Sequence, residues 1–403
     1  MSRVRDRLVG VLRLMRACSC WLVDGIAIVS RTPAKRINHT LVVRLDGIGD
    51  FILWLGYAQQ LRALYPNEHM VLVANRIWAN WVRELGIFDE VWPLDRKRFL
   101  NHPGYRLIFQ RSVRRAGFSR VINPVHSREA WLGDSIVRTC GAQLRQGFIG
   151  DLANASGFEH WLSSHWYSNL LASDSRPLME LRRNAEFLRE LTGTPVLASA
   201  AKLRPIISAL MIRDDLRTDY ILVPGAGWAG RRWPPANFVE LANRIHSRTG
   251  WHGAVCGSDD EKALADQVIS KSEAPLVNLC GRLSLMEMSQ IASASKLVVT
   301  NETSHVHLAA AVGTPCVCVL GGGHFGRFFP YDADDGDVRD YPKAVFQRMD
   351  CFDCNWHCKF PRTEHEPTRC IGNILVDEVW REVVRILEKS DTVYLIGHDE
   401  QSL

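Results

Sequence analysis

The sequence predicts an α/β protein made of two Rossmann-like domains, each a doubly wound parallel sheet. From Thr40 onward, short runs of β-branched and other apolar residues alternate with helix-like stretches, and the alternation starts again near Tyr220. Strands that alternate with helices favour a parallel sheet with helices on both faces. The chain has 403 residues, enough for two or three domains. Two such domains facing each other would enclose a cleft at the carboxyl ends of their strands, where ligands bind in this fold class.

The predicted strands fall into two sets. They are Thr40–Leu45, Met70–Asn75, Glu90–Leu94 and Arg120–Val125, then Tyr220–Pro224, His252–Gly257, Pro275–Leu279, Leu297–Thr300 and Cys316–Leu320. Glycine and prolines interrupt the pattern near residues 193–215, so the join between the domains is expected there. The predicted segments are an N-terminal stretch, 1–36, and two domains, 37–205 and 206–403.

Composition restricts the classes of function. The 49 Lys and Arg against 44 Asp and Glu leave a net charge of +5. A basic excess this small and dispersed argues against nucleic-acid binding, although it would suit an anionic substrate or a membrane surface. The 11 cysteines are an odd number, and many lie in apolar strand-like runs, as buried reduced thiols do in cytosolic proteins. We therefore expect a cytoplasmic protein that binds no nucleic acid.

The first thirty residues predict a basic amphipathic helix, because apolar residues share one helical face and arginines surround it. The apolar positions are Val4, Leu8, Val11, Leu12, Met15, Leu22, Ile26 and Val29, and the arginines are Arg3, Arg5, Arg7, Arg13 and Arg16. Such helices lie at anionic membrane surfaces, so residues 1–30 predict a peripheral contact with the inner face of the cytoplasmic membrane. Packing of this helix on its own domain or on a partner is an equal alternative.

The first predicted strand runs into a turn with two carboxylates, Arg44-Leu45-Asp46-Gly47-Ile48-Gly49-Asp50. The two glycines let the backbone approach a ligand closely. The dinucleotide fingerprint is not matched, because its third glycine is missing and a carboxylate at the helix start would repel a phosphate. Asp50 is therefore predicted to face a hydroxyl group that it deprotonates. The alternative is that Asp50 only caps the helix, and Asp46 has the same ambiguity.

Two later turns carry groups suited to phosphate. The first contains Gly225 and leads to Arg231 and Arg232, so that backbone N–H groups and guanidinium groups would meet a diphosphate. Its alternative is a pair of surface arginines beside a packed tryptophan.

The second turn is Asn301-Glu302-Thr303-Ser304-His305-Val306-His307, at the junction of a strand and a helix. Unpaired N–H groups at a helix start suit phosphate oxygens, and Glu302 would accept hydrogen bonds from sugar hydroxyl groups. The next strand runs into Gly321-Gly322-Gly323, where the backbone could again wrap a ligand, so Gly322 is a further candidate. The alternative for the histidines is an ordinary place in the core.

These motifs, in this order, resemble glycosyltransferase family 9, the bacterial ADP-heptose heptosyltransferases of lipopolysaccharide core synthesis. The matching stretches are LDGIGDFIL, VPGAGWAGRRWPPANFVELA and LCGRLSLMEMSQIASASKLVVTNETSHVHLAAAVGTPCVCVLGG. The resemblance extends over residues 38–390. It implies the GT-B fold of two Rossmann-like domains, an inverting mechanism and catalysis that requires no metal cofactor.

The resemblance also implies roles for single residues. Asp50 matches the family's candidate base, and Arg231 matches its phosphate-binding lysine. The family's Asn-Asp-Ser/Thr-Gly-x-x-His turn matches Asn301 to His307, except that Glu302 replaces the Asp and Ser304 replaces the Gly. Both departures would reshape the pocket for the donor's sugar or phosphate.

The resemblance assigns the acceptor to residues 37–205 and the nucleotide sugar, most of all an ADP-sugar such as ADP-heptose, to residues 206–403. The acceptor would be the lipopolysaccharide core or another lipid-linked glycan. Acceptor contacts are expected from first-domain loops, at Asp46, His126 and Arg128, since loops carry specificity in such scaffolds.

The densest set of soft ligands lies in residues 351–370 and consists of Cys351, Cys354, Cys358 and Cys370. Four thiolates could form a closed tetrahedral site for structural zinc or iron, although the spacing lacks a second tight pair. A metal finger of this sort is a feature of the protein-modifying heptosyltransferases within the wider family. Reduced or disulfide-linked structural cysteines are the alternative.

Other functions remain open alongside transfer to a lipid-linked glycan. A metal at the cysteines would favour a protein-modifying heptosyltransferase. A nucleotide-sugar epimerase shares the two-domain architecture, and a catalytically silent nucleotide-binding scaffold is the third alternative.

Overall fold

The computed structural model describes residues 2–29, 36–207, 212–334 and 341–399, and the chain divides into two compact units. Unit 1 comprises Met1–Phe51, Tyr57–Arg176 and Arg183–Val196, and unit 2 comprises Ile52–Gly56, Pro177–Arg182 and Leu197–Leu403. The chain passes into unit 2 for the last time after Val196, within the region where the sequence places the join.

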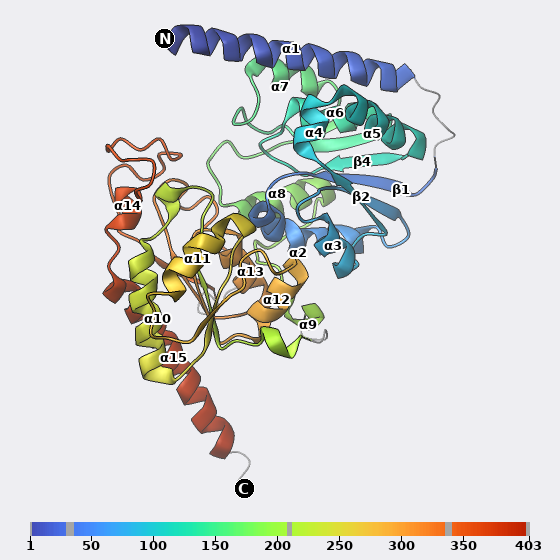
Figure 1. The fold of residues 1–403 in the computed structure, drawn as a ribbon. Helices are drawn as coiled ribbons and strands as arrows, with labels where there is room; N and C mark the ends of the chain where they lie inside the picture. The colour runs from blue at the N-terminus through green and yellow to red at the C-terminus, as the bar shows by residue number, and fades with distance from the viewer. Residues whose placement is uncertain (1, 30–35, 208–211, 335–340, 400–403) are drawn as a thin grey trace. The chain divides into compact units, whose positions relative to one another are not determined.

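Unit 1 contains a six-stranded parallel sheet (Figure 1). Its strands are β1 (His39–Arg44), β2 (His69–Asn75), β3 (Glu90–Leu94), β4 (Arg120–Asn123), β5 (Leu144–Phe148) and β6 (Asn169–Leu171), in the order β3-β2-β1-β4-β5-β6. The order reverses between β1 and β4, as in a doubly wound Rossmann sheet. Strands β5 and β6 are absent from the sequence prediction, because LRQGF and NLL contain no β-branched residue.

Unit 2 repeats the same topology. Its strands are β7 (Tyr220–Val223), β8 (Gly253–Val255), β9 (Leu276–Asn278), β10 (Leu297–Asn301), β11 (Cys316–Val319) and β12 (Lys343–Val345), in the order β12-β11-β10-β7-β8-β9. All pairings are parallel. The edge strand β12 has three residues, too few for a periodic pattern. The predicted α/β class with two Rossmann-like parts is confirmed.

Helices flank both sheets. Those of unit 1 are α1 (Ser2–Val29), α3 (Ala79–Leu85), α4 (Arg96–Asn101), α5 (Pro103–Ala116), the π-helix η1 (Ala130–Asp134), α6 (Ser135–Cys140), α7 (Gly157–Ser164) and α8 (Glu180–Thr192), with α2 (Ile48–Leu64) starting in this unit. Those of unit 2 are α9 (Arg204–Ile207), α10 (Pro235–Thr249), α11 (Lys262–Ile269), α12 (Leu285–Ala294), α13 (Ser304–Val312), α14 (Arg369–Gly372) and α15 (Val376–Asp399), with short 3-10 turns η2 (Asp214–Leu216), η3 (Ala229–Arg231) and η4 (Asp259–Glu261). None of the helices in the described ranges is both long and apolar enough to cross a bilayer.

The N-terminal helix α1 packs on α5 and α6 of unit 1 (Figure 1). Its buried face carries Cys20, Val23, Asp24 and Ala27. The predicted apolar face points elsewhere, because the positions Met15, Leu22, Ile26 and Val29 are all exposed. The side chains of the predicted positions Val4, Leu8, Val11 and Leu12 lie outside the described residues. The helix packs on its own domain, as one of the two sequence alternatives expects, and an apolar face of the helix stays exposed.

A buried ion pair fixes this packing. Asp24 and Arg106 have at most 1% of their side-chain surface exposed, and both guanidinium–carboxylate contacts measure 2.7 Å. Gln110 donates a further hydrogen bond of 3.0 Å to Asp24. Trp21 adds aromatic contacts, since its ring lies 3.7 Å from the Arg138 guanidinium carbon.

We predict that Asp24→Leu lowers the free energy of unfolding by about 3–5 kcal/mol, because it leaves the Arg106 charge buried and unpaired. The double variant Asp24→Leu/Arg106→Met should recover most of this loss, since two apolar side chains replace the pair. Denaturant unfolding of the three proteins measures both effects. A single variant as stable as the parent would show that the pair does not hold α1 in place.

Candidate active-site residues of each unit

In unit 1 the strand β1 ends directly before the turn that carries Asp50. Helix α2 begins at Ile48 with Gly47 as its N-cap and without a side-chain cap. Asp50 is therefore inside the first turn of the helix, and the capping alternative is wrong. Its carboxylate forms no hydrogen bond or ion pair with the described residues. A Cβ atom at Gly47 would lie 3.0 Å from Asp50 Oδ2, so glycine keeps the space beside the carboxylate open.

The second carboxylate of this turn, Asp46, forms an ion pair within the same unit. Its Oδ2 lies 2.7 Å from Nε of the buried Arg44. Its backbone carbonyl accepts hydrogen bonds from Asn75 Nδ2 at 3.1 Å and from Trp78 Nε1 at 3.0 Å. Asp46 thus braces the turn, while Asp50 keeps its carboxylate free of such contacts. The structure resolves an ambiguity that the sequence leaves open.

The predicted acceptor residues of the loop after β4 have different environments. Arg128 is 1% exposed and pairs with Asp134 at 2.8 Å, so its assignment to the acceptor is corrected: burial removes its guanidinium from any ligand. His126 is partly exposed and lies 3.5 Å from Asp151. Burial by itself would raise the pKa of Asp151, but hydrogen bonds from His126, Ala153 and Ser127 lower it overall.

In unit 2 a buried asparagine joins two of the predicted donor turns. Asn301, at the end of β10, donates from Nδ2 to the carbonyls of Pro224 at 2.8 Å and Gly225 at 3.3 Å. Its Oδ1 accepts from the Trp233 N–H at 3.0 Å. The turn after β7 and the turn after β10 are therefore held together at the carboxyl edge of the sheet.

Arg231 and Glu302 meet at this edge and are incompletely satisfied. Arg231 Nη2 donates to the Glu302 carbonyl at 2.6 Å and lies 3.4 Å from Glu302 Oε2. The buried atoms Arg231 Nε and Glu302 Oε2 have no hydrogen-bond partner among the described residues. Burial raises the pKa of Glu302 to about 7, although the Arg231 charge opposes this. Buried polar atoms without partners are costly, and they occur where a ligand completes the site.

The start of α13 adds hydrogen-bond donors. Thr303 is the N-cap, and its hydroxyl accepts from the His305 N–H at 3.3 Å. The N–H groups of Thr303 and Ser304 have no partner among the residues that the structure describes. A helix N-terminus with free N–H groups and its positive dipole end favours an anion.

His307 lies buried behind this turn. Its Nδ1 is 2.8 Å from the Tyr331 hydroxyl, and the two rings are stacked. Burial lowers the pKa of His307 to about 3, and the charge of Arg231 acts in the same direction. The imidazole is therefore neutral near pH 7 and can donate or accept a hydrogen bond, but it brings no positive charge.

Arg232 and Gly225, also predicted to bind the nucleotide-sugar donor, make contacts within unit 2 instead. Arg232 donates to the Ala226 carbonyl at 3.1 Å and so braces its own turn. A Cβ at Gly225 would lie 1.9 Å from the Glu261 carboxylate. Close packing against Glu261 therefore accounts for a glycine at this position.

The assignment of Gly322 to a phosphate is also corrected, because its N–H donates to Cys370 Sγ at 3.5 Å. Its Cα faces the Phe352 ring, since an added Cβ would lie 2.2 Å from that ring. Gly321 and Gly323 face Trp356 in the same way. The glycine run therefore makes room for aromatic side chains of the cysteine-rich segment rather than for a ligand.

The predicted metal site is not formed. Cys351, Cys354, Cys358 and Cys370 are free thiols. Burial raises the pKa of Cys354, and the neighbouring thiols add to this. Across the described parts of the chain, however, no three His, Cys, Asp or Glu side chains form a group that could hold a metal ion. The segment instead contributes packing.

One contact of this segment was missing from the sequence analysis. The Arg231 guanidinium carbon lies 5.0 Å from the centre of the Trp356 ring, a cation–π distance. Trp356 in turn meets the edge of Trp228 at a centroid distance of 5.7 Å. No spacing rule could have joined residues so far apart in the sequence, so this aromatic cover follows from the tertiary structure alone.

Comparison with known proteins gives the context of these groups. The lipooligosaccharide heptosyltransferase 2 of Haemophilus influenzae is 24% identical over 313 residues, which cover 70% of this chain and 83% of that protein. The structure of E. coli ADP-heptose LPS heptosyltransferase II has a TM-score of 0.65 at 17% identity, covering 88% of this chain and 99% of that one. Dodecameric iron-containing heptosyltransferase TibC, solved with ADP-D-β-D-heptose, has a TM-score of 0.53 at 12% identity, covering 88% of this chain and 78% of that one. These two structural similarities show a shared fold.

The sequence profile described as glycosyltransferase family 9 (heptosyltransferase) matches residues 106–356, more than half of the chain. The motif resemblance found in the sequence is thereby confirmed, and the protein is an enzyme that uses a nucleotide sugar. The chain belongs to glycosyltransferase family 9, the heptosyltransferases.

Proposed function

We propose that this enzyme transfers a heptose from ADP-heptose to the lipopolysaccharide core or another lipid-linked glycan, with inversion at the anomeric carbon and without a catalytic metal. The names of the relatives support the donor and the pathway. The observation that carries the proposal is a set of polar groups that make no hydrogen bond to the described residues: the Asp50 carboxylate in unit 1, and Arg231 Nε with Glu302 Oε2 in unit 2.

Asp50 is the general base in this mechanism. It takes the proton of an acceptor hydroxyl while the oxygen forms a bond to the anomeric carbon, on the face opposite the nucleotide. The bond from that carbon to the diphosphate breaks, and ADP leaves with the electron pair. Attack from the opposite face inverts the configuration.

The leaving diphosphate needs hydrogen-bond donors and positive charge. Arg231 offers the charge and an unused Nε–H group, and Thr303 and Ser304 offer backbone N–H groups at the α13 terminus. His307, neutral in its buried place, is limited to a hydrogen bond. The Trp356 ring lies 5.0 Å from the guanidinium carbon, at a cation–π distance.

Two alternatives lose support. Membership of a glycosyltransferase family sets the epimerase aside. A metal at the cysteines would favour the protein-modifying alternative, and the described cysteines form no group that could hold a metal ion.

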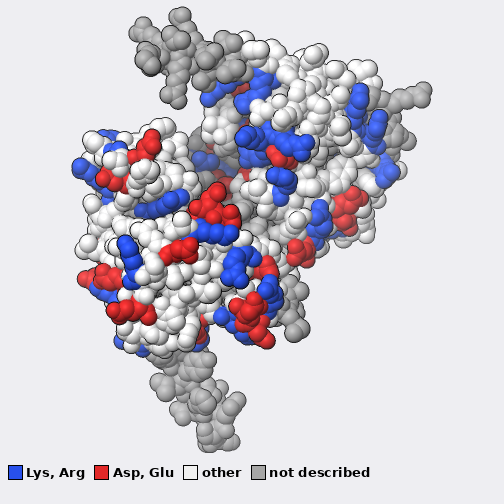
Figure 2. All heavy atoms as spheres, viewed as in Figure 1, with Lys and Arg blue, Asp and Glu red and all other residues white. Residues whose placement is uncertain are grey.

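We also propose that the enzyme works in the cytoplasm at the inner membrane surface. The exposed apolar face of α1, at Met15, Leu22, Ile26 and Val29, is accompanied by the exposed Arg13 and Arg16. Apolar and basic groups on one helix favour an anionic bilayer. Figure 2 shows that basic side chains also gather on the neighbouring surface of unit 1.

We expect Asp50→Asn to lower kcat by about 10²- to 10⁴-fold, because positioned base catalysis contributes that much. Affinity for ADP, measured by calorimetry, should not change. Asp89→Asn is the matched control, since Asp89 is an exposed carboxylate of the same unit that pairs with Arg62. Near-normal turnover of Asp50→Asn would refute its role as the base.

Arg231→Ala should weaken ADP binding at least about tenfold, because a charge-assisted hydrogen bond to the diphosphate is lost. Arg231→Lys should recover part of the affinity, since it keeps the charge but not the planar fork. Arg217→Gln, an exposed arginine of unit 2, serves as the control. Unchanged ADP affinity in Arg231→Ala would remove Arg231 from the donor site.

Glu302 should impose a pH dependence on stability. The folded state holds its proton up to about pH 7, whereas the unfolded carboxyl ionises near pH 4.5. Stability from this group is therefore complete below pH 4.5 and is lost as the pH rises through 7, by roughly 3 kcal/mol. The free energy of unfolding of Glu302→Gln minus that of the parent should increase over this range.

Burial lowers the pKa values of His305 and His307 to about 4 and about 3, so these residues make stability rise with pH. Both proteins contain the two histidines, so their contribution cancels when the two free energies of unfolding are subtracted. Denaturant unfolding at several pH values provides the measurement. A difference independent of pH would show that Glu302 titrates normally.

A further inference from the structure

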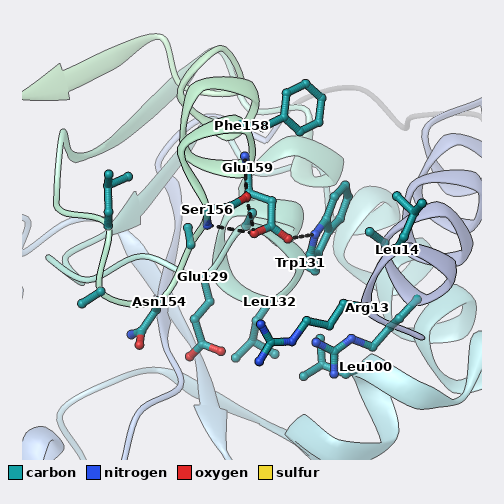
Figure 3. A pocket seen from close by; sticks show the side chains of 16 residues that line it. Arg13, Leu14, Leu100, Glu129, Trp131, Leu132, Asn154, Ser156, Phe158 and Glu159 are labelled. Carbon is teal, nitrogen blue, oxygen red and sulfur yellow. Dashed lines mark hydrogen bonds between the residues drawn. The ribbon is translucent and has the colours of Figure 1, made fainter. Parts of the chain in front are cut away.

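Unit 1 contains a cavity of about 660 Å³ between α1 and the loops at the carboxyl edge of its sheet (Figure 3). Three segments line most of it: Arg13, Leu14, Arg16 and Ala17 of α1, the start of η1 with Glu129, and residues 152–156 of the loop after β5. Helix α1 lies outside the residues matched by the family profile. The cavity is therefore built partly from a segment that the family assignment does not explain.

Two arginines of α1 face this cavity, and neither forms a hydrogen bond or ion pair within the described part of the chain. Arg13 and Arg16 are three residues apart, so they share one side of the helix. Figure 3 shows Arg13 extending from α1 into the pocket. Both arginines are exposed, so a ligand that enters the cavity can reach them. Guanidinium forks of this kind match phosphate and carboxylate groups.

The acidic residues of the cavity already have partners. Glu129 pairs with Arg96 at 2.6 Å. Glu159 accepts from Trp131 Nε1 at 2.6 Å and from the Ser156 N–H at 2.9 Å. Burial would raise the pKa of Glu159, but these hydrogen bonds and the charge of Arg16 lower it. The cavity is lined by two arginines, Arg13 and Arg16, and by two carboxylates, of which Glu129 is paired with Arg96 outside the lining.

Large apolar side chains lie beside the arginines. Leu14, Leu152 and Phe158 all line the cavity and are exposed to 66%, 60% and 67%. Exposed apolar groups next to free guanidinium groups suit an amphiphile, with an anionic head at the arginines and an apolar part along the rim.

Arg96 links this cavity to the catalytic turn. Its Nη1 donates to the Leu45 carbonyl at 2.9 Å, and its Nη2 pairs with Glu129 in the cavity wall. Leu45 directly precedes Asp46 and lies five residues before Asp50 in the same turn. Glu129 of the cavity wall is therefore joined through Arg96 to the turn that carries the proposed base.

We propose that this cavity binds the anionic head group of the lipid-linked acceptor, with Arg13 and Arg16 as positioning residues. The proposal rests on the proposed function and adds the residues that would position the acceptor's anionic group, Arg13 and Arg16 of α1. Helix α1, fixed by Asp24, serves both as a wall of the acceptor site and as its contact with the bilayer.

Calorimetric titration with hexyl phosphate tests the pocket directly, because this probe joins an anionic head to a short apolar chain. Inorganic phosphate and hexyl glucoside are the partial probes. The variant is Arg13→Gln/Arg16→Gln, and the control is Arg189→Gln, an exposed arginine of unit 1 on α8. We expect hexyl phosphate to bind at least about tenfold more tightly than either partial probe, and the double variant to lose at least tenfold.

Equal binding of hexyl phosphate to parent, variant and control, or binding to none of them, would overturn the proposal. If inorganic phosphate bound as tightly as hexyl phosphate, the proposal that the ligand is an amphiphile would be refuted, because the cavity would then recognise the anion alone.

A transfer assay separates this result from the proposed function. With ADP-heptose and detergent-solubilised lipopolysaccharide that lacks heptose, the double variant should raise the acceptor KM about tenfold while kcat and ADP affinity stay unchanged. An unchanged KM in an active enzyme would refute the role of the arginines. Absence of transfer in the parent would refute the proposed function, and the hexyl phosphate titration would still decide the pocket.

Discussion

In a parallel sheet all strands end at the same edge, and the following helices begin there. This constraint organises the chemistry of both units. In unit 1 it places Asp50 in the first turn of α2, directly after β1. In unit 2 it brings Arg231, from the turn after β7, to Glu302, from the turn after β10, at an ion-pair distance of 3.4 Å. Asn301 locks these two turns together through its side-chain amide.

At the carboxyl edge of the unit 2 sheet, burial determines which side chains carry a charge. Glu302 and His307 are both buried, and both shift toward their neutral forms. The Arg231 guanidinium has the aromatic ring of Trp356 beside it. A guanidinium, free backbone N–H groups and little competing negative charge are what a departing diphosphate requires. In the proposed mechanism, a protonated Glu302 would not repel the donor.

Helix α1 shows how one buried polar contact directs a whole element. Asp24 interrupts an otherwise apolar stretch, and Arg106 draws it into unit 1. The face around Asp24 therefore becomes the packed face, and the more apolar face with Leu22 and Ile26 stays outside. The same rotation turns Arg13 and Arg16 toward the cavity of unit 1. A single buried pair thus sets both the open apolar surface and the open positive charges.

The sequence by itself determined the α/β class, the central strands and the turns of the site, because periodicity and glycine-rich turns are local signals. It also singled out Asp50 and Arg231. Tertiary structure decided which of the predicted residues can reach a ligand. Arg128 is buried in an ion pair, and Gly322 packs against the Phe352 ring. Only the fold could bring Trp356 to Arg231, since their contact depends on packing between segments far apart in the chain. Local sequence fixes which groups are present, whereas long-range packing decides which of them remain available to a ligand.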